Sequence, residues 1–153
     1  MSTFQELLDA HPEWMEQARA RVDKQIVLLA TVRKDGAPRL HPVRPFLSGD
    51  GRLIVFSSPG SPKTADLRRD GRVALHPGFD RESKTGGEVL LSGRASELDA
   101  EDRARVAGAA PFDVGPGILF AISLERVVGL FELDGQIRRV RYNAQTGAQV
   151  DEL

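Results

Sequence analysis

The sequence predicts a mainly β protein in which about seven antiparallel strands, with short helices between them, close into a small barrel. Short apolar runs rich in Val, Ile and Leu recur along the chain, and Gly-containing turn signals separate them. The first three runs leave no room for crossover helices, which disfavours a parallel doubly wound sheet. Closure into a barrel removes the exposed edges that an open sheet would present.

The 153 residues are enough for one domain with a buried core. Apolar residues at helical spacing predict helices in residues 1–24, and Pro12 divides them into two short ones. We therefore expect a single domain over residues 1–153. It consists of an N-terminal helical cap (1–24), a barrel (26–142) and a C-terminal tail (143–153).

The first strands are joined by short turns. The run IVLLATV starts at residue 26, and Asp35-Gly36 after it supplies the positive φ angles that a tight turn needs. The stretches PRLHPVRPFL and RLIVFSS follow as the second and third strands. The three strands form a meander.

The rest of the chain alternates two helix signals with four further strands. Ser61-Pro62 starts a helix over 62–69, because a serine oxygen caps orphan amides and proline suits the first helical position. Asp99, with an acidic residue three positions later, starts a second helix in DAEDRARVAGAA. The remaining strands are RVALHP, EVLLSGRASEL, GILFAISLERVVGLFEL and QIRRVRYN.

Charge and composition argue against several classes of function. Twenty-one basic and twenty-two acidic side chains give a net charge of −1, so we expect neither a nucleic-acid partner nor a membrane partner. No apolar run approaches the ~20 residues that span a bilayer. The absence of cysteine excludes disulfides and thiolate metal sites. The start MSTFQELLDA lacks a signal-peptide pattern, so we expect a cytoplasmic protein.

Metal and nucleophilic chemistry are not predicted. His11, His41 and His76 lack zinc-site spacing, and the chain has neither a Gly-x-Ser-x-Gly elbow nor a Walker loop. Taken singly, each histidine is interpreted as structural or exposed, and His41 alone is kept as a candidate. The basic runs RRVR and Arg68-Arg69 are interpreted as a solvated face.

The stretch SSPGSPKTAD at 57–66 carries the strongest candidate site. The helix start at Ser61 places Lys63 in the first turn, where the helix dipole is positive and a cation is mildly disfavoured. Exposed amides, the hydroxyls of Ser57 and Ser61, and a lysine can together bind a phosphate. From these residues alone, a phosphate site and a solvated lysine are equally favoured.

Three stretches together resemble the FMN-binding split-barrel superfamily: LLATVRKDGAPRLHPVRPF, GRLIVFSSPGSPKTADLRRDGRVAL and GEVLLSGRASEL. Its members include pyridoxamine 5'-phosphate oxidase and the actinobacterial flavin and deazaflavin oxidoreductases. The resemblance covers about residues 26–98. It implies a six- to seven-stranded antiparallel split β-barrel with Greek-key-like order and short flanking helices. It also implies a homodimer with a flavin-type cofactor at each interface.

The resemblance also implies which residues hold the cofactor. Phe56 and Ser57 end the strand that meets the phosphate, Lys63 is the phosphate lysine, and Ser61 lies at the helix start beside it. Glu88 takes the place of an amide side chain near the ring, and an ionised carboxylate there only accepts hydrogen bonds. The strand along the isoalloxazine ring comprises His41, Pro42, Val43, Arg44, Pro45 and Phe46.

The chain departs from the oxidase at two places. His41 and Pro62 stand where the oxidase has arginines, which removes part of its phosphate clamp. The chain ends RVRYNAQTGAQVDEL, whereas the oxidase ends in an Arg/Trp-containing segment that completes its substrate site. The resemblance therefore does not extend to oxidation of vitamin B6. These departures are more similar to the actinobacterial branch, in which some members use the deazaflavin F420 instead of FMN.

The function implied by the resemblance is that of an FMN-dependent oxidoreductase acting on a small organic substrate, with F420 as the alternative cofactor. No catalytic side chain is assigned, because the ring chemistry belongs to the cofactor. The missing arginines instead favour a non-catalytic flavin, deazaflavin or haem carrier on the same fold, or a barrel without a ligand. Arg68, Arg69 and Lys84 are candidate cations for the anionic tail of F420, although solvent exposure explains them as well.

Overall fold

The computed structural model describes all residues from 1 to 153. Short helices alternate with the strands of a single sheet. The elements are α1 (Phe4–Ala10), α2 (Pro12–Val22), β1 (Val27–Val32), β2 (Pro38–Val43), β3 (Phe46–Leu47), β4 (Leu53–Ser57), α3 (Pro62–Arg69), β5 (Arg72–His76), β6 (Val89–Glu97), α4 (Ala100–Val106), the 3-10 turn η1 (Ala107–Ala109), β7 (Ile118–Leu133), β8 (Gln136–Asn143) and β9 (Gly147–Glu152).

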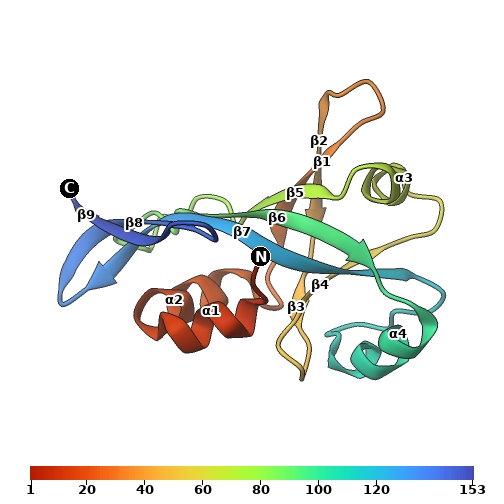
Figure 1. Cartoon of the computed structure of the whole chain (residues 1–153), viewed down its shortest axis with the longest axis horizontal. Coiled ribbons are helices and arrows are strands. Elements are labelled where there is room, and N and C mark those ends of the chain that lie inside the picture. Colours follow the sequence, from red (N-terminus) through yellow and green to blue (C-terminus); the bar gives the residue numbers. More distant parts are fainter.

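All nine strands form one antiparallel sheet with the path β2-β1-β5-β6-β7-β4-β3 (Figure 1). Strands β2 and β3 are neighbours in sequence but are not hydrogen-bonded to each other, so the barrel is open along one seam. Strand β7 also pairs with β8, which pairs with β9. The predicted class, a mainly β split barrel with short flanking helices, is confirmed.

The length of β7 connects the barrel to an arm. Its 16 residues pair with β4 near the start and with β8 from Arg126 onwards. Along β6 the register shifts between Ser92 and Gly93, and such bulges bend and twist a strand. The second half of β7 therefore leaves the barrel with β8 and β9, and Figure 1 shows these strands extending to one side.

The N-terminal helices cover one face of the sheet, as predicted. Thr3 and Glu6 form a capping box, in which the Thr3 hydroxyl accepts from the Glu6 amide at 3.2 Å. Pro12 begins α2 and separates it from α1. Trp14 is buried, and its ring centroid lies 5.9 Å from that of Phe131 on β7. The helical cap therefore closes the larger apolar core against the sheet (Figure 1).

A second, smaller apolar cluster lies under α4. Asp99 accepts a hydrogen bond from the Asp102 amide at 2.8 Å, which confirms the predicted helix start. The helix ends at Val106, and residues 107–109 continue as a 3-10 turn. The buried members of the cluster are Phe46, Ile54, Val106, Val114 and Leu119.

Two sequence predictions about the strands are wrong. The stretch PRLHPVRPFL forms two strands instead of one, because Pro45 has no amide hydrogen and its carbonyl instead accepts from the Lys24 amide at 2.8 Å. The segment 143–153 is not a tail, because residues 147–152 pair with β8 as β9. Gly147 starts β9 with a φ of 83°, which suits a tight turn. The sheet has nine strands for these two reasons.

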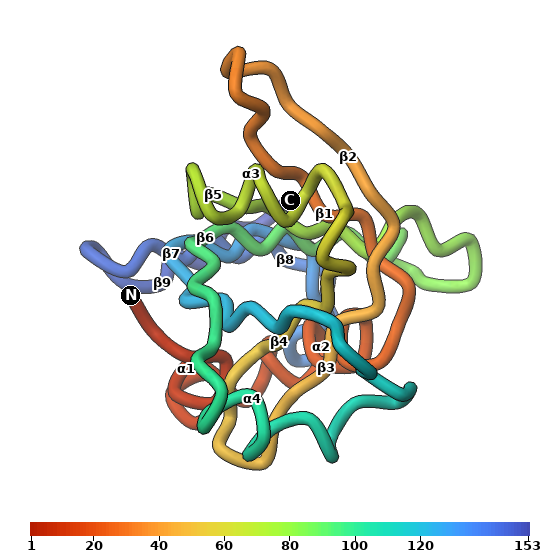
Figure 2. The backbone as a smooth tube through the Cα atoms, turned by 90° about the vertical axis from the view of Figure 1, so that its right-hand side faces the viewer, coloured from red at the N-terminus to blue at the C-terminus, as the bar shows by residue number.

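The β1–β2 hairpin projects from the rest of the sheet and runs beside α3 (Figures 1 and 2). Burial alternates along β2, so Arg39 and His41 lie on the same face as Val43, while Leu40 and Pro42 are exposed on the other face. The alternation directs Arg39 and His41 toward the side on which α3 lies. Separately, none of the helices is long and apolar enough to cross a membrane.

Candidate functional site

Buried hydroxyls fix the junction between β4 and α3. Ser57 and Thr64 are almost fully buried, at 0% and 1% exposure, and their hydroxyls are hydrogen-bonded to each other. The Thr64 hydroxyl also donates to the Ser58 carbonyl oxygen at 2.7 Å. Because Thr64 uses its only hydrogen there, Ser57 donates to Thr64. These bonds hold the connecting turn against the first turn of the helix.

Ser61 is the residue before α3, as predicted, but its hydroxyl does not cap the helix. The hydroxyl instead accepts a hydrogen bond from Lys63 Nζ at 3.2 Å. The expected side-chain cap is therefore wrong. No side chain accepts from the first-turn amides: Pro62 has no amide hydrogen, and the Thr64 amide donates to the Ser61 carbonyl oxygen at 3.0 Å.

Lys63 is a partly buried cation without an anionic partner. It forms no ion pair with any carboxylate of the chain, and its one hydrogen-bond partner is Ser61. Burial lowers the pKa of the Lys63 ammonium from its usual value. An unpaired ammonium in this position adds to the positive end of the helix dipole instead of opposing it, and the arrangement favours an anion there.

His41 approaches the same region from β2. Its Nε2 atom is buried and has no hydrogen-bond partner. Burial lowers the pKa of His41, and the positive charges of Lys63 and Arg39 lower it further, which outweighs the opposing effect of Asp66. The imidazole is therefore neutral at pH 7, and its buried Nε2 is left without a hydrogen-bond partner inside the chain.

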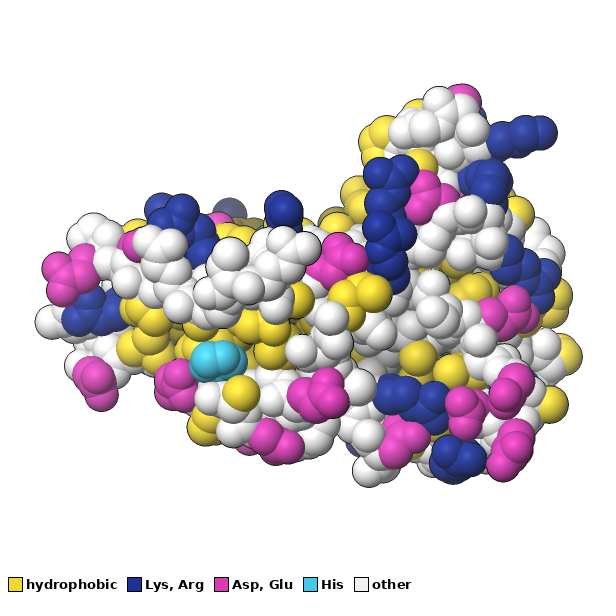
Figure 3. Space-filling model, viewed as in Figure 1, with side chains coloured by type: hydrophobic (Ala, Val, Ile, Leu, Met, Phe, Trp, Pro, Cys, Tyr) yellow, Lys and Arg dark blue, Asp and Glu magenta, His cyan; other side chains and the backbone are white.

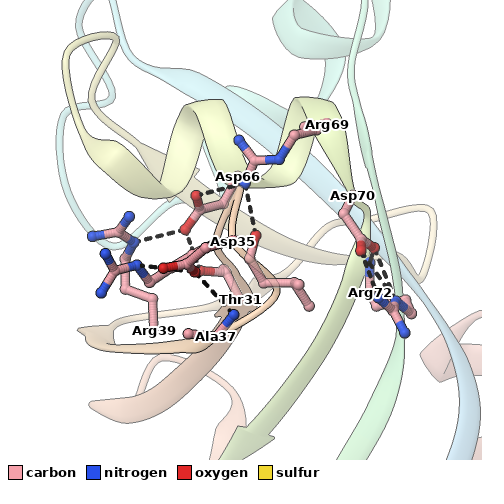
Figure 4. A network of polar contacts seen from close by, with 10 residues as sticks. Thr31, Asp35, Ala37, Arg39, Asp66, Arg69, Asp70 and Arg72 are labelled. Carbon is pink, nitrogen blue, oxygen red and sulfur yellow. Dashed lines mark hydrogen bonds and ion pairs between the residues drawn. The ribbon is translucent and has the colours of Figure 1, made fainter.

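Next to His41, a buried carboxylate joins α3 to the hairpin (Figure 4). Asp66 accepts from the Thr31 hydroxyl at 2.8 Å, from Arg39 Nε at 2.7 Å and from Arg69 at 3.0 Å. Burial opposes its ionisation, but the hydrogen bonds from Arg39, Thr31 and Arg69 outweigh that effect and lower its pKa. This cluster was not predicted from the sequence, although the alternation of β2 would have placed Arg39 on the same face as His41.

Only part of the predicted site comes together in one chain. The structure brings Ser57, Ser61, Lys63 and His41 to the first turn of α3. Glu88 instead lines a hollow with Leu90 and Val128, on the sheet face opposite to the main core. A single chain therefore does not place the predicted ring-edge acid beside the phosphate lysine.

The remaining residues of the predicted ring-facing strand divide between core and solvent. Val43, Pro45 and Phe46 are buried, and Phe46 packs in the second cluster. Pro42 and Arg44 are exposed, and Arg44 Nε donates to the Lys24 carbonyl oxygen at 2.9 Å.

Phe56 packs edge-on against Phe112, with ring centroids 5.4 Å apart, so it faces the second cluster instead of Thr64.

The three candidate cations for an anionic tail already have carboxylate partners. Arg68 makes a bidentate pair with Glu97 at 2.8 and 2.7 Å. Arg69 binds the buried Asp66, and Lys84 lies 3.6 Å from Glu132. Each of these three cations therefore has a carboxylate partner, whereas Lys63 has none.

The sequence of this chain matches a known protein family. The model for pyridoxamine 5'-phosphate oxidase matches residues 14–129, from α2 through most of β7. The chain belongs to the pyridoxamine 5'-phosphate oxidase family. Within the chain, the C-terminal arm of β8 and β9 follows the segment that matches the family.

Solved structures share the fold of this family member at low identity. PhzG from Burkholderia lata 383, in complex with tetrahydrophenazine-1-carboxylic acid, is 19% identical with a TM-score of 0.65, covering 100% of this chain and 93% of its own. A pyridoxamine 5'-phosphate oxidase-related, FMN-binding protein from Nostoc punctiforme is 14% identical with a TM-score of 0.64, covering 96% of both chains. A haem-binding protein from Mycobacterium smegmatis is 19% identical with a TM-score of 0.60, covering 84% of this chain and 58% of its own. No curated protein matches the chain.

Proposed function

We propose that this protein binds FMN, with F420 as the alternative, and transfers hydride or electrons to a small organic substrate. The observation that carries the proposal is Lys63, a partly buried cation without a carboxylate partner in the first turn of α3. Membership of the pyridoxamine 5'-phosphate oxidase family supports it, as does the FMN-binding relative from Nostoc punctiforme.

The residues at this turn fit a phosphate monoester. Lys63 Nζ has three donors, of which one goes to Ser61, so two are free for phosphate oxygens. The Lys63 amide, which no side chain caps, adds a donor next to this ammonium. The nearest carboxylate cluster, at Asp66, is neutralised by arginines, so it does not repel an anion.

The main role of the chain would be to bind the cofactor and to orient it. When bound, the flavin-type ring supplies the hydride or electron transfer. Lys63 would neutralise the phosphate, while the buried bonds of Ser57 and Thr64 would keep the turn in a fixed geometry. The side chain that acts on the substrate is not among these residues.

We further propose that the protein works as a homodimer. One sheet face exposes apolar side chains on adjacent strands, including Leu28, Leu40 and Leu90, and Glu88 lies at the border of this face. A second copy is the occupant that explains two features together. It covers the apolar face, and it provides a Glu88 from outside the chain that holds Lys63. Light scattering should give twice the mass of the chain, and Leu28→Arg with Leu90→Arg should give the single mass. A single mass for the native protein contradicts this part of the proposal.

A carrier without catalysis is the second candidate. Similarity to the haem-binding protein from Mycobacterium smegmatis favours it. Reduction of the bound cofactor separates the two functions. Reduction by NAD(P)H, or by an F420-reducing system, followed by reoxidation with a substrate supports the oxidoreductase. A cofactor that never cycles supports the carrier.

Titration with FMN and, separately, with F420 tests the cofactor site directly, with ligand fluorescence as the readout. We expect micromolar or tighter binding of one of them, corresponding to about 8 kcal/mol. Lys63→Ala should weaken that binding at least tenfold, and Lys84→Ala, which removes the same charge from another surface, should leave it unchanged. Haem is titrated in parallel by its absorbance. Binding of none of the three ligands refutes the proposal.

A further inference from the structure

A groove separates the β1–β2 hairpin from α3, on the side of the helix next to Lys63. Its volume is about 510 Å³. Hairpin residues form one wall and helix residues form the other, and Figure 4 shows several of these side chains. The lining residues are Arg33, Lys34, Asp35, Arg39, Pro62, Ala65, Asp66 and Arg69.

The lining of the groove is positively charged. It contains four cations and two carboxylates, which leaves two positive charges in excess. Basic side chains gather on and around the projecting hairpin in the space-filling view (Figure 3). The protein as a whole carries a net charge of −1, so this excess is a local feature.

The carboxylates are largely occupied. Asp66 already accepts hydrogen bonds from Thr31, Arg39 and Arg69. Asp35 accepts from the Ala37 amide at 3.0 Å within its own turn. Neither acid therefore needs a further cation, and the groove offers few free acceptors to a ligand.

Most of the donors, in contrast, are free. Arg39 uses only its Nε atom, so its two terminal nitrogens have no partner. The Arg33 side chain makes no hydrogen bond and its Nε lies 3.7 Å from an Asp35 oxygen, and the Lys34 side chain has neither an ion pair nor a hydrogen bond. Arg69 is the most constrained cation of the groove, because its Nη2 donates both to Asp66 and to the Val32 carbonyl oxygen. Three cations thus converge on one groove with donors to spare.

We infer that this groove is a second anion subsite, which binds phosphate or carboxylate groups of a multiply charged ligand. Guanidinium groups are well suited to oxyanions, because they present paired N–H donors in a fixed plane. Pro62 lines the groove and Lys63 follows it in the chain, so the two subsites adjoin the same helical turn. A ligand with several anionic groups can therefore reach both. The inference rests on the proposed function only in taking Lys63 as the first anion site.

The Arg39–Asp66–Arg69 cluster also ties α3 to the hairpin, so substitutions within it would damage the fold. Arg33 and Lys34 lie outside that cluster and are exposed, which makes them the appropriate residues to change. A matched control exists on another loop. Arg81 and Lys84 are also one exposed arginine and one exposed lysine, and they do not line the groove.

The test is calorimetric titration of the full chain with inorganic tripolyphosphate at 0.15 M salt. Inorganic phosphate, with a single phosphate group, is the comparison. We expect tripolyphosphate to bind more tightly than phosphate and more weakly as salt rises. Arg33→Gln with Lys34→Gln should reduce its affinity about tenfold, and Arg81→Gln with Lys84→Gln should change it less than about twofold. No binding at this salt, or an equal loss in both double variants, overturns the inference.

Two further titrations identify the natural ligand class and separate this inference from the proposed function. Loss of F420 affinity in the groove variant, with FMN affinity retained, assigns the groove to the anionic tail of the cofactor. If the groove variant loses affinity for tripolyphosphate but not for FMN or F420, the groove binds a polyanion other than the cofactor. If the native protein binds none of FMN, F420 and haem while the groove variant loses tripolyphosphate affinity, the proposed function fails and the anion-binding groove stands.

Discussion

Ser57, the last residue of β4, and Thr64, in the first turn of α3, share a hydrogen bond between two buried hydroxyls. The bond joins a strand of the barrel to the helix that carries Lys63, and Thr64 continues it to the Ser58 carbonyl oxygen. The position of Lys63 therefore depends on a small polar contact inside the core.

Thr64→Val keeps the shape of the side chain but removes both hydrogen bonds. We expect it to lower the free energy of unfolding by about 1–3 kcal/mol, because it leaves a buried hydroxyl and a carbonyl oxygen without partners. Urea denaturation measures this loss. Thr146→Val, at an exposed turn, is the matched control and should change stability by less than about 0.5 kcal/mol. Equal effects of the two substitutions would contradict a structural role for the Ser57–Thr64 pair.

Asp66→Asn should destabilise the protein by about 3 kcal/mol at pH 7, because it breaks a buried charge cluster. The pKa of Asp66 is lowered in the folded state, so its stabilising contribution is complete above the unfolded value of about 3.9 and is lost as pH falls through the folded value. The difference in the free energy of unfolding between the native protein and the Asp66→Asn variant should therefore become smaller at acidic pH. Urea denaturation at pH 7 and near pH 3 checks this. A stability difference that does not change with pH, or an equally large loss for the exposed Asp35→Asn, would contradict this role of the buried Asp66.

Gly93→Ala should destabilise the barrel by more than about 3 kcal/mol. A Cβ atom at this position of β6 would lie 1.8 Å from the Ser123 carbonyl oxygen, and the backbone of β7 would have to move. Gly108→Ala is the control, since a Cβ atom there meets nothing within 4 Å. Thermal denaturation of both variants distinguishes the steric clash at position 93 from a general effect of removing a glycine.

Local signals were sufficient for the helices. Pro62 predicted the start of α3 even though Ser61 does not cap it, and the Asp99 cap predicted the start of α4, because these signals depend on a few adjacent residues. The strands were predicted less well. The effect of Pro45 depends on which neighbour its strand would have paired with. Strand β9 has a polar sequence and is stabilised by pairing with β8 instead of by burial.

The candidate site was predicted in its local part only. Lys63 and Ser61 follow from the helix start, but the use of the Ser61 hydroxyl by Lys63 is a side-chain choice that spacing does not determine. The partners of Asp66 are 35 and 27 residues away in sequence, at Thr31 and Arg39. Contacts of that range follow from the sheet register, which no short motif encodes.

Lys63→Met should stabilise the protein without a ligand, by about 0.5–1 kcal/mol. Burial lowers the pKa of the ammonium, so the charged form carries a penalty in the folded state at neutral pH, and the methionine removes that penalty. The penalty of the native lysine should fall as pH rises through its folded pKa, so the advantage of the variant should shrink in alkaline solution. Thermal denaturation at pH 7 and pH 10 measures both effects. Lower stability of the variant at pH 7 would mean that Lys63 serves the fold.

The open seam of the barrel leaves β2 as an edge strand, with β1 as its single neighbour. Two of its six residues, Pro38 and Pro42, have no amide hydrogen to offer. A strand from another molecule that approached this edge would find few donors with which to pair. Pro38 and Pro42 therefore protect the seam against edge-to-edge aggregation. Replacing both by residues with a free amide is expected to create an aggregation-prone surface even if the barrel itself folds unchanged.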